Sequence, residues 1–577
     1  MPLPALLENR LRLPIVGAPM FLVSTPALVL AQCAAGIVGG FPALNARPAA
    51  VLDDWLSEIT EKLAALERAN PAAKIAPFAV NQIVHASNER LEHDVALCVK
   101  HRVPIVITSL RPPAEVVSAV HGYGGIVFHD VINQRHAEKA AEQGVDGIIA
   151  VCAGAGGHAG LLSPFALVKQ VREVYPGTII LAGAMSTGAD VLAAQAMGAD
   201  LAYLGTRFIA TAESAAAPGY KQMVVDSGAE DIVYTSLFSG VSANFLRDSV
   251  RRTGLDPDNL PAADKAKMSF AEGSHEFKAW RDVWSAGQSV SGVHEVLPVS
   301  ALVERMAAEY AAARARLAAH DRAHPESPAA PFAVNQIVHK SNARLEEDMA
   351  LTVKWKAPIV ITSLGAREDV NAAVHAYGGL TLHDIINNRF AHKAIEKGAD
   401  GLIAVAAGAG GHAGSTSPFA LIQDIRAWFD GPLLLSGAIA TGRAVLAAQV
   451  MGADLAYIGS AFVATPEARA IDEYKQAIVS GDASDIIGST YFTGIFGNYL
   501  RPSIVRSGLD PESLPQGEAK AMNFTSRGSS EAKEAKAWRD IWGSGQGIGA
   551  VKSVQPVAEL VARLAREYAE AKNRVCN

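Results

Sequence analysis

The chain has 577 residues, of which half are apolar and 19% are charged, and its formal net charge is −7. This length exceeds one ordinary hydrophobic core and predicts two domains, and the composition is typical of a globular protein. The mild charge, with no basic run, argues against nucleic acid or a membrane surface as a partner. No apolar stretch is long enough to cross a bilayer and the N-terminus does not resemble a signal peptide, so we expect a soluble, cytoplasmic protein.

Short apolar runs alternate with helical patterns through the first half of the chain. Parallel strands buried on both faces have continuous apolar sequences, so eight such strands, each followed by a helix, predict a (β/α)₈ barrel. An open doubly wound sheet is the alternative, and the count of eight favours the closed barrel. The predicted strands are residues 14–19, 36–41, 78–84, 104–109, 125–129, 147–152, 178–183 and 201–205.

The second half of the chain repeats most of the first. PFAVNQIVH begins at residue 77 and again at residue 331, and AGAGGHAG begins at residue 153 and again at residue 407. Nothing in the second copy corresponds to LPIVGAPMFLVS or GIVGGFPAL, which contain the first two predicted strands. We therefore predict that residues 1–320 form a complete barrel and that residues 321–577 form a truncated copy without its first two strands.

The last two predicted strands end in small residues. In a (β/α)₈ barrel the binding residues lie at the C-terminal ends of the strands, and this corner is a frequent phosphate site. Glycines there let main-chain N–H groups approach an anion, and Thr206 adds a hydroxyl. We predict a phosphate site at Gly183, Gly205 and Thr206, in which a side chain at Gly183 would occupy the space of the phosphate. The alternative is that these glycines only turn each strand into a loop.

The segment AGAGGHAG holds one imidazole, that of His158, among residues with almost no side chains. Glycine lacks a Cβ and lets a flat ligand lie against the main chain, and a neutral imidazole can act as a base near pH 7. A hydrogen-bonded structural histidine is the alternative. The sequence has no nucleophile elbow and no metal-ligand spacing, so cofactor chemistry with one protein base fits better than hydrolysis.

The ordered set GAPM, VNQ, GGHAG, AGA and GTRF resembles the nitronate monooxygenases, also called 2-nitropropane dioxygenases, which are FMN-dependent TIM barrels. The resemblance implies that FMN is the cofactor and that O₂ oxidises an alkyl nitronate to a carbonyl compound and nitrite without a metal. It implies that His158 faces the flavin, as a base or as a hydrogen-bond partner of the nitro group. The flavin-binding residues that it implies are Ala18, Pro19, Met20, Asn81, Gly154, Gly157, Gly183, Gly205 and Thr206.

This sequence departs from the family pattern at two places. Relatives often carry a lysine after strand five, where this chain has His129-Asp130 in the first copy and His383-Asp384 in the second. A cation there would stabilise negative charge on the flavin ring. Relatives also often read QG-x-E-A-G-G-H, whereas this chain reads VCAGAGGH over residues 151–158, with apolar Val151 in place of the glutamine. Both changes lie in the expected wall of the pocket and bear on the choice of substrate.

Two other functions are compatible with these residues. One is an NAD(P)H-dependent flavin reductase of quinones or enoyl thioesters, although no G-x-G-x-x-G motif supports a dedicated dinucleotide domain. The other is a barrel that binds FMN or another phosphate ligand without catalysis. The second copy keeps His412 and Gly437 but lacks the GAPM strand, so we expect an incomplete flavin site there. Its open sheet edges need cover, and a homo-oligomer is one way to provide it.

Overall fold

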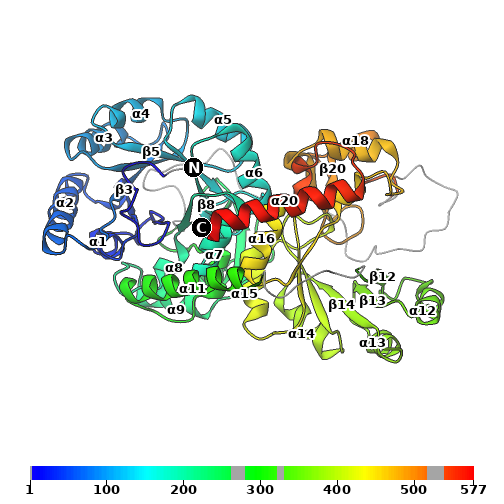
Figure 1. Ribbon diagram of the computed structural model, residues 1–577. Coiled ribbons are helices and arrows are strands. Elements are labelled where there is room, and N and C mark those ends of the chain that lie inside the picture. The colour runs from blue at the N-terminus through cyan, green and yellow to red at the C-terminus, as the bar shows by residue number, and fades with distance from the viewer. Residues whose placement is uncertain (1–2, 262–279, 321–329, 516–538, 577) are drawn as a thin grey trace. The chain divides into compact units, whose positions relative to one another are not determined.

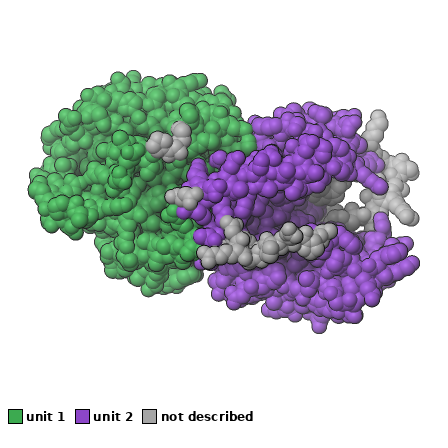
Figure 2. Space-filling view, viewed as in Figure 1, with its two compact units in different colours: residues 1–315 green, residues 316–577 purple. Residues whose placement is uncertain are grey.

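The computed structural model describes residues 3–261, 280–320, 330–515 and 539–576. The chain divides into two compact units, residues 1–315 and 316–577, which Figure 2 shows in green and purple. The predicted domain boundary at residues 320 and 321 adjoins the stretch 321–329, which lies outside the described residues. No helix of the described part of the chain is long and apolar enough to span a membrane.

Unit 1 contains one eight-stranded parallel sheet closed into a barrel. Its strands are β1 (Ile15–Gly17), β2 (Gly39–Pro42), β3 (Phe78–Val84), β4 (Ile105–Leu110), β5 (Ile126–Val131), β6 (Gly147–Val151), β8 (Thr178–Ala182) and β9 (Leu201–Leu204). They are hydrogen-bonded in the order β1-β9-β8-β6-β5-β4-β3-β2. The seam between β1 and β2 is joined by Gly17 N–H to the Val38 carbonyl at 2.7 Å and by Val38 N–H to the Ile15 carbonyl at 3.1 Å. The predicted (β/α)₈ barrel is confirmed.

Helices follow the strands and form the outer layer of unit 1 (Figure 1). Proline at the start of α1, α6 and α9 fixes a helical φ where no N–H is needed. The helices are α1 (Pro26–Ala34), α2 (Val51–Ala69), α3 (Leu91–Lys100), α4 (Ala114–His121), α5 (Gln134–Glu142), α6 (Pro164–Val174), α7 (Gly188–Met197), α8 (Thr206–Ile209), α9 (Pro218–Asp226), α10 (Arg247–Arg251) and α11 (Val299–His320).

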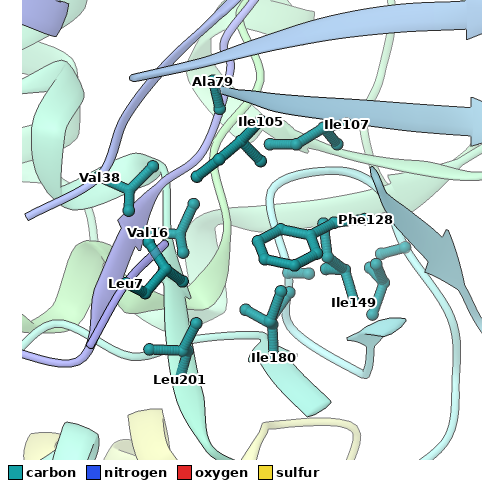
Figure 3. Packing of buried hydrophobic residues seen from close by; sticks show 14 residues of the cluster. Leu7, Val16, Val38, Ala79, Ile105, Ile107, Phe128, Ile149, Ile180 and Leu201 are labelled. Carbon is teal, nitrogen blue, oxygen red and sulfur yellow. The ribbon is translucent and has the colours of Figure 1, made fainter. Parts of the chain in front are cut away.

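The inside of the barrel is a packed apolar core. Ile107, Phe128 and Ile180 point toward one another there, together with Leu7 from the N-terminal segment (Figure 3). Because side chains alternate along a strand, the inward face of β5 continues from Phe128 to Asp130, one layer nearer the C-terminal end. The carboxyl end of the barrel is therefore lined by polar as well as apolar side chains.

A small antiparallel sheet lies beside the barrel strands in unit 1. It consists of β7 (Gly157–His158), β11 (Ala243–Leu246) and β10 (Ile232–Thr235), in the order β10-β11-β7. The histidine of AGAGGHAG thus lies on a two-residue strand and not in an irregular loop, with His158 opposite Ala243. The difference arises because a distant segment supplies the main-chain partner, which local sequence periodicity does not show.

Unit 2 contains a six-stranded parallel sheet. Its strands are β12 (Ala333–Ile337), β13 (Ile359–Ser363), β14 (Leu380–Ile385), β15 (Gly401–Val405), β17 (Leu433–Ser436) and β18 (Leu455–Tyr457), hydrogen-bonded in that order. A second small sheet holds β16 (Gly411–His412), β20 (Gly497–Leu500) and β19 (Ile486–Ser489). The helices are α12 (Leu345–Lys354), α13 (Glu368–His375), α14 (Asn388–Glu396), α15 (Pro418–Arg426), α16 (Gly442–Met451), α17 (Ser460–Val463), α18 (Asp472–Ser480), α19 (Arg501–Arg506) and α20 (Val557–Cys576).

The sheet of unit 2 is open at both edges. Among the described residues, β12 pairs only with β13 and β18 only with β17. Phe332, beside the first edge, is 61% exposed, whereas its counterpart Phe78 in unit 1 is 4% exposed. Leu455, on the other edge, is 62% exposed, whereas Leu201 is fully buried. The prediction of a copy without its first two strands is confirmed.

Candidate active site

The ends of the first and last barrel strands meet. Ala18 N–H donates to the carbonyl of Leu204 at 2.8 Å, and a Cβ added to Gly205 would lie 3.3 Å from Ala18 Cβ and 3.6 Å from Met20 Sδ. The side-chain amide of Asn45 donates to the carbonyl of Met20 at 3.0 Å and fixes this turn. Ala18, Pro19 and Met20 are half-buried, so one face of the turn stays accessible beside Gly205.

The segment 286–288 closes the corner beside Thr206. Gly287 N–H donates to Thr206 Oγ1 at 2.8 Å, and Gln288 N–H donates to the carbonyl of Gly154 at 2.9 Å. A Cβ on Gly156 would lie 2.9 Å from Gly287 N and 3.0 Å from Thr206 Oγ1. The predicted residues Gly154 and Thr206 are therefore brought together by a segment that sequence reasoning did not assign to the site. Its only signal was the recurrence of AGQ, which reads SGQ in the second copy.

Gly183 ends β8 with φ +146°, a conformation that side-chain-bearing residues rarely adopt. A Cβ there would lie 2.4 Å from Cys152 Sγ and 3.2 Å from the carbonyl of Ala153. A side chain at Gly183 would therefore collide with the segment that follows β6, and that it would also occupy the space of a phosphate stays a prediction. The N–H groups of residues 183–185 donate no hydrogen bond to another described residue, so they are available to an anion.

The glycine loop is held by side chains from the β11 region. Asn244 donates from its side-chain amide to the carbonyl of Ala155 at 2.6 Å, and Gly157 N–H donates to Ser285 Oγ at 2.9 Å. Gly154 and Gly157 have φ of +83° and +71°, which favour glycine. These contacts give His158 a defined main-chain position, although the segments that supply them lie far along the chain.

The imidazole of His158 is recessed at the end of the barrel. Its Nε2 is buried and has no hydrogen-bond partner among the described residues. The ring of Trp280 meets it edge to face, with 5.4 Å between centroids. Burial lowers the pKa of His158, and the charge of Asp130 opposes that shift. A buried polar atom without a partner is uncommon in a native fold, so Nε2 is a candidate to bind a ligand or a water molecule.

The remaining predicted residues lie around this centre. Asn81 on β3 donates to Ser109 Oγ at 3.0 Å and to the carbonyl of Ile107 at 3.2 Å, on the inward face of the barrel. Pro19 lies toward β2 instead, because a Cβ on Gly40 would be 3.4 Å from its Cδ. Val151, the apolar departure from the family pattern, belongs to the apolar core of the barrel, and so does Ala155.

These features fit a phosphorylated planar cofactor. The free N–H groups of residues 183–185 and the Thr206 corner suit a phosphate. The turn at Ala18–Met20 is half-buried beside Gly205 and would serve as a wall for a ring. Nε2 of His158 has no hydrogen-bond partner among the described residues and so suits a reacting group.

Unit 2 keeps only part of this arrangement. Gly545 N–H donates to Ser460 Oγ at 2.9 Å, as Gly287 does to Thr206, and Gly437 has φ +144°. A Cβ on Gly459 would meet nothing within 4 Å, because the chain has no counterpart of the Ala18–Met20 turn. His412 Nε2 lies 3.0 Å from Thr493 Oγ1 and is thus engaged. Unit 2 therefore has a counterpart of the corner at Thr206 and Gly287, but no counterpart of the turn that would support the ring of a cofactor.

Comparisons with known proteins identify the family of this chain. The family model for nitronate monooxygenase matches residues 7–309 and again residues 316–567. A nitronate monooxygenase of Paraburkholderia phytofirmans is 29% identical over 355 residues, which covers 51% of this chain and 92% of that protein. A (3aS,4S,5R,7aS)-5-hydroxy-7a-methyl-1-oxo-octahydro-1H-indene-4-carboxyl-CoA dehydrogenase of Mycobacterium tuberculosis is 27% identical over 237 residues, covering 41% of this chain and 63% of that protein. The solved nitroalkane oxidase of Streptomyces ansochromogenes is 26% identical, with a TM-score of 0.44, and covers 54% of this chain and 100% of that one.

Proposed function

Because the chain belongs to the nitronate monooxygenase family, whose members are flavin-dependent oxidoreductases, we propose that unit 1 binds FMN and oxidises alkyl nitronates. The products are a carbonyl compound and nitrite, and O₂ is the second substrate. When bound, the flavin supplies a two-electron acceptor that O₂ can reoxidise. The observation that carries the proposal is the buried, unpartnered Nε2 of His158 beside a corner suited to one phosphate.

The chain's own residues have separable tasks in this reaction. The N–H groups of residues 183–185 and the hydroxyl of Thr206 would hold the phosphate, and the Ala18–Met20 turn would support the ring. FMN rather than FAD is proposed because unit 1 offers one phosphate corner and the sequence has no G-x-G-x-x-G motif for a dinucleotide.

His158 is the proposed base for neutral nitroalkanes. Because burial lowers its pKa, the imidazole is neutral at pH 7 and Nε2 can accept the proton from the carbon that bears the nitro group. A preformed nitronate has already lost that proton. His158 is therefore required for neutral nitroalkanes and much less for nitronates.

A second candidate is a dehydrogenase or NAD(P)H-dependent reductase acting on a thioester. The similarity to the carboxyl-CoA dehydrogenase of Mycobacterium tuberculosis supports it. In that case a nicotinamide would reduce the flavin, and a nitronate would not. Anaerobic mixing of the purified full chain with NADH or with ethyl nitronate separates the two candidates by the bleaching of the flavin spectrum.

The test of the base uses His158→Asn, with His412→Asn in unit 2 as the matched control. We expect His158→Asn to keep its flavin, to lose about 100-fold in kcat/KM for nitroethane, and to change little with ethyl nitronate. His412→Asn should leave both reactions unchanged. Full turnover of nitroethane by His158→Asn would show that the histidine is not the base, and bleaching by NADH alone would favour the second candidate.

A further inference from the structure

Asp130 places a carboxylate inside the carboxyl end of the barrel. It follows Phe128 by two residues on β5, and Phe128 belongs to the inward core (Figure 3). The alternation of a strand therefore turns Asp130 inward as well. Its carboxylate accepts no hydrogen bond from any described residue. This half-buried carboxylate is therefore free to interact with a neighbouring group that gains a positive charge.

The strand that carries His158 returns over the end of β5. A Cβ on Gly160, two residues beyond His158, would lie 3.1 Å from Cβ of Ile132, which is two residues beyond Asp130. His158 and Asp130 therefore lie on the same side of the carboxyl end of the barrel. Burial lowers the pKa of His158, and the charge of Asp130 opposes that effect.

In unit 2, the side chains at the two corresponding positions have hydrogen-bond partners within the chain. Asp384, the counterpart of Asp130, accepts from Ser363 Oγ at 2.8 Å. His412 lies 3.0 Å from Thr493 Oγ1. In unit 1 neither bond exists among the described residues, so a free carboxylate and a free imidazole occur together only where the barrel is complete.

We propose that Asp130 is the positioning residue of His158, whose carboxylate stabilises the imidazolium that forms when His158 takes a proton from a neutral substrate. This rests on the proposed function, in which His158 is the base. In this step the C–H bond beside the nitro group breaks, the proton moves to Nε2, and the electron pair stays on the substrate as a nitronate. No electron transfer is part of the step.

The other groups that feel the charge of Asp130 do not compete for it. Burial and Asp130 raise the pKa of Tyr203 on β9 far above its ordinary value, so this hydroxyl stays neutral. Burial lowers the pKa of His129, and its Nδ1 lies 2.8 Å from Thr108 Oγ1. Burial and the neighbouring cations of α5 lower the pKa of His136. Of these three histidines, only His158 has a buried ring nitrogen without a hydrogen-bond partner among the described residues.

The first test measures His158 itself rather than turnover. The imidazole of flavin-loaded, full-length protein is titrated by NMR with labelled histidine, and its signal is assigned by its loss in His158→Asn. We expect Asp130→Asn to lower the midpoint of His158, Asp130→Glu to restore it, and the matched control Asp384→Asn to leave it unchanged. An unchanged midpoint in Asp130→Asn would overturn the proposal. Asp130→Ser gives the same comparison if the asparagine variant does not retain flavin.

The second test is the pH profile of kcat/KM. For nitroethane we expect Asp130→Asn to lose about tenfold and its acid limb to move to lower pH, because the imidazole becomes a weaker base. For ethyl nitronate the change should stay within about twofold, since no proton is removed. If Asp130→Asn moves the NMR midpoint of His158 but the wild-type chain oxidises no nitroalkane, the proposed function is wrong and the interaction between Asp130 and His158 is still supported. If His158→Asn abolishes nitroethane oxidation while Asp130→Asn changes neither the NMR midpoint nor the pH profile, the role of Asp130 is contradicted and the proposed function is kept.

Discussion

The side-chain amide of Asn244 donates a hydrogen bond to the main-chain carbonyl of Ala155 at 2.6 Å, across 89 positions of sequence. Asn498 makes the same bond to Ala409 in unit 2, also at 2.6 Å. Both asparagines are buried. In unit 1 this bond anchors the loop that carries His158, and in unit 2 it anchors the equivalent loop without a complete site beside it.

Asn244→Ala should destabilise the protein and lower activity together. The carbonyl of Ala155 would stay buried without a partner, which costs about 1–3 kcal/mol in free energy of unfolding. We expect urea denaturation to show this loss and kcat/KM for nitroethane to fall as the loop loosens. Asn498→Ala is the matched control, with a similar loss of stability and unchanged activity. Equal losses of activity in both variants would contradict the assignment of the site to unit 1.

Thr206→Val tests the phosphate corner. Valine keeps the shape but removes the acceptor of Gly287 N–H, which leaves a buried donor unpaired at a cost of about 1–3 kcal/mol. The proposed phosphate ligand is lost as well, so we expect weaker FMN binding in a fluorescence titration of the apoprotein. Ser460→Ala removes the corresponding acceptor of Gly545 in unit 2 and should leave FMN affinity unchanged. An unaltered FMN affinity in Thr206→Val would place the phosphate elsewhere.

His383 should contribute an acid-sensitive part to the stability of unit 2. Burial lowers its pKa from 6.5 to about 4. Between these values the unfolded chain binds a proton that the folded chain does not, so the free energy of unfolding falls as pH falls, by about 3 kcal/mol over the window. Burial raises the pKa of neighbouring Asp384 to about 6, which acts in the opposite direction below that pH.

The two contributions are separated by one variant. His383→Gln removes the histidine contribution and leaves that of Asp384. Urea denaturation at pH 4 and at pH 7 should therefore show a smaller decline with acid in His383→Gln than in the wild type. The comparison at pH 7 is the internal control, because the histidine is neutral in both states of the chain there. An identical decline in both proteins would show that His383 is not the acid-sensitive group.

We expect one tightly bound FMN per chain. The corner at Ser460 and Gly545 offers unit 2 a place for phosphate, but the open side of Gly459 offers no wall for the ring. The ratio of flavin to protein absorbance after gel filtration measures the stoichiometry. Two FMN per chain would show that unit 2 also forms a whole site.

Much of the fold follows from local sequence. The apolar runs predicted all eight strands of unit 1, because buried parallel strands need such runs whatever follows them. The missing GAPM strand predicted the open sheet of unit 2. The glycines of AGAGGHAG indicated backbone conformations that other residues rarely adopt, and Gly154 and Gly157 do have positive φ.

The contacts that define the site could not be predicted in this way. The pairing of His158 with Ala243 and the bond from Gly287 to Thr206 join segments distant in sequence. A local pattern carries no information about which distant segment returns to it. The reason for glycine at position 183 was also hidden, since it depends on where the sulfur of Cys152 lies.

The seam of the barrel has a dynamic consequence. Two main-chain bonds, at Gly17 and Val38, join β1 to the segment before β2, whereas β3 and β4 share six registered pairs. A local fluctuation that parts the seam breaks fewer bonds than one anywhere among the central strands. Hydrogen–deuterium exchange should therefore be faster at these two amides than at those of β4. The barrel should open locally at this seam more often than between its other neighbouring strands.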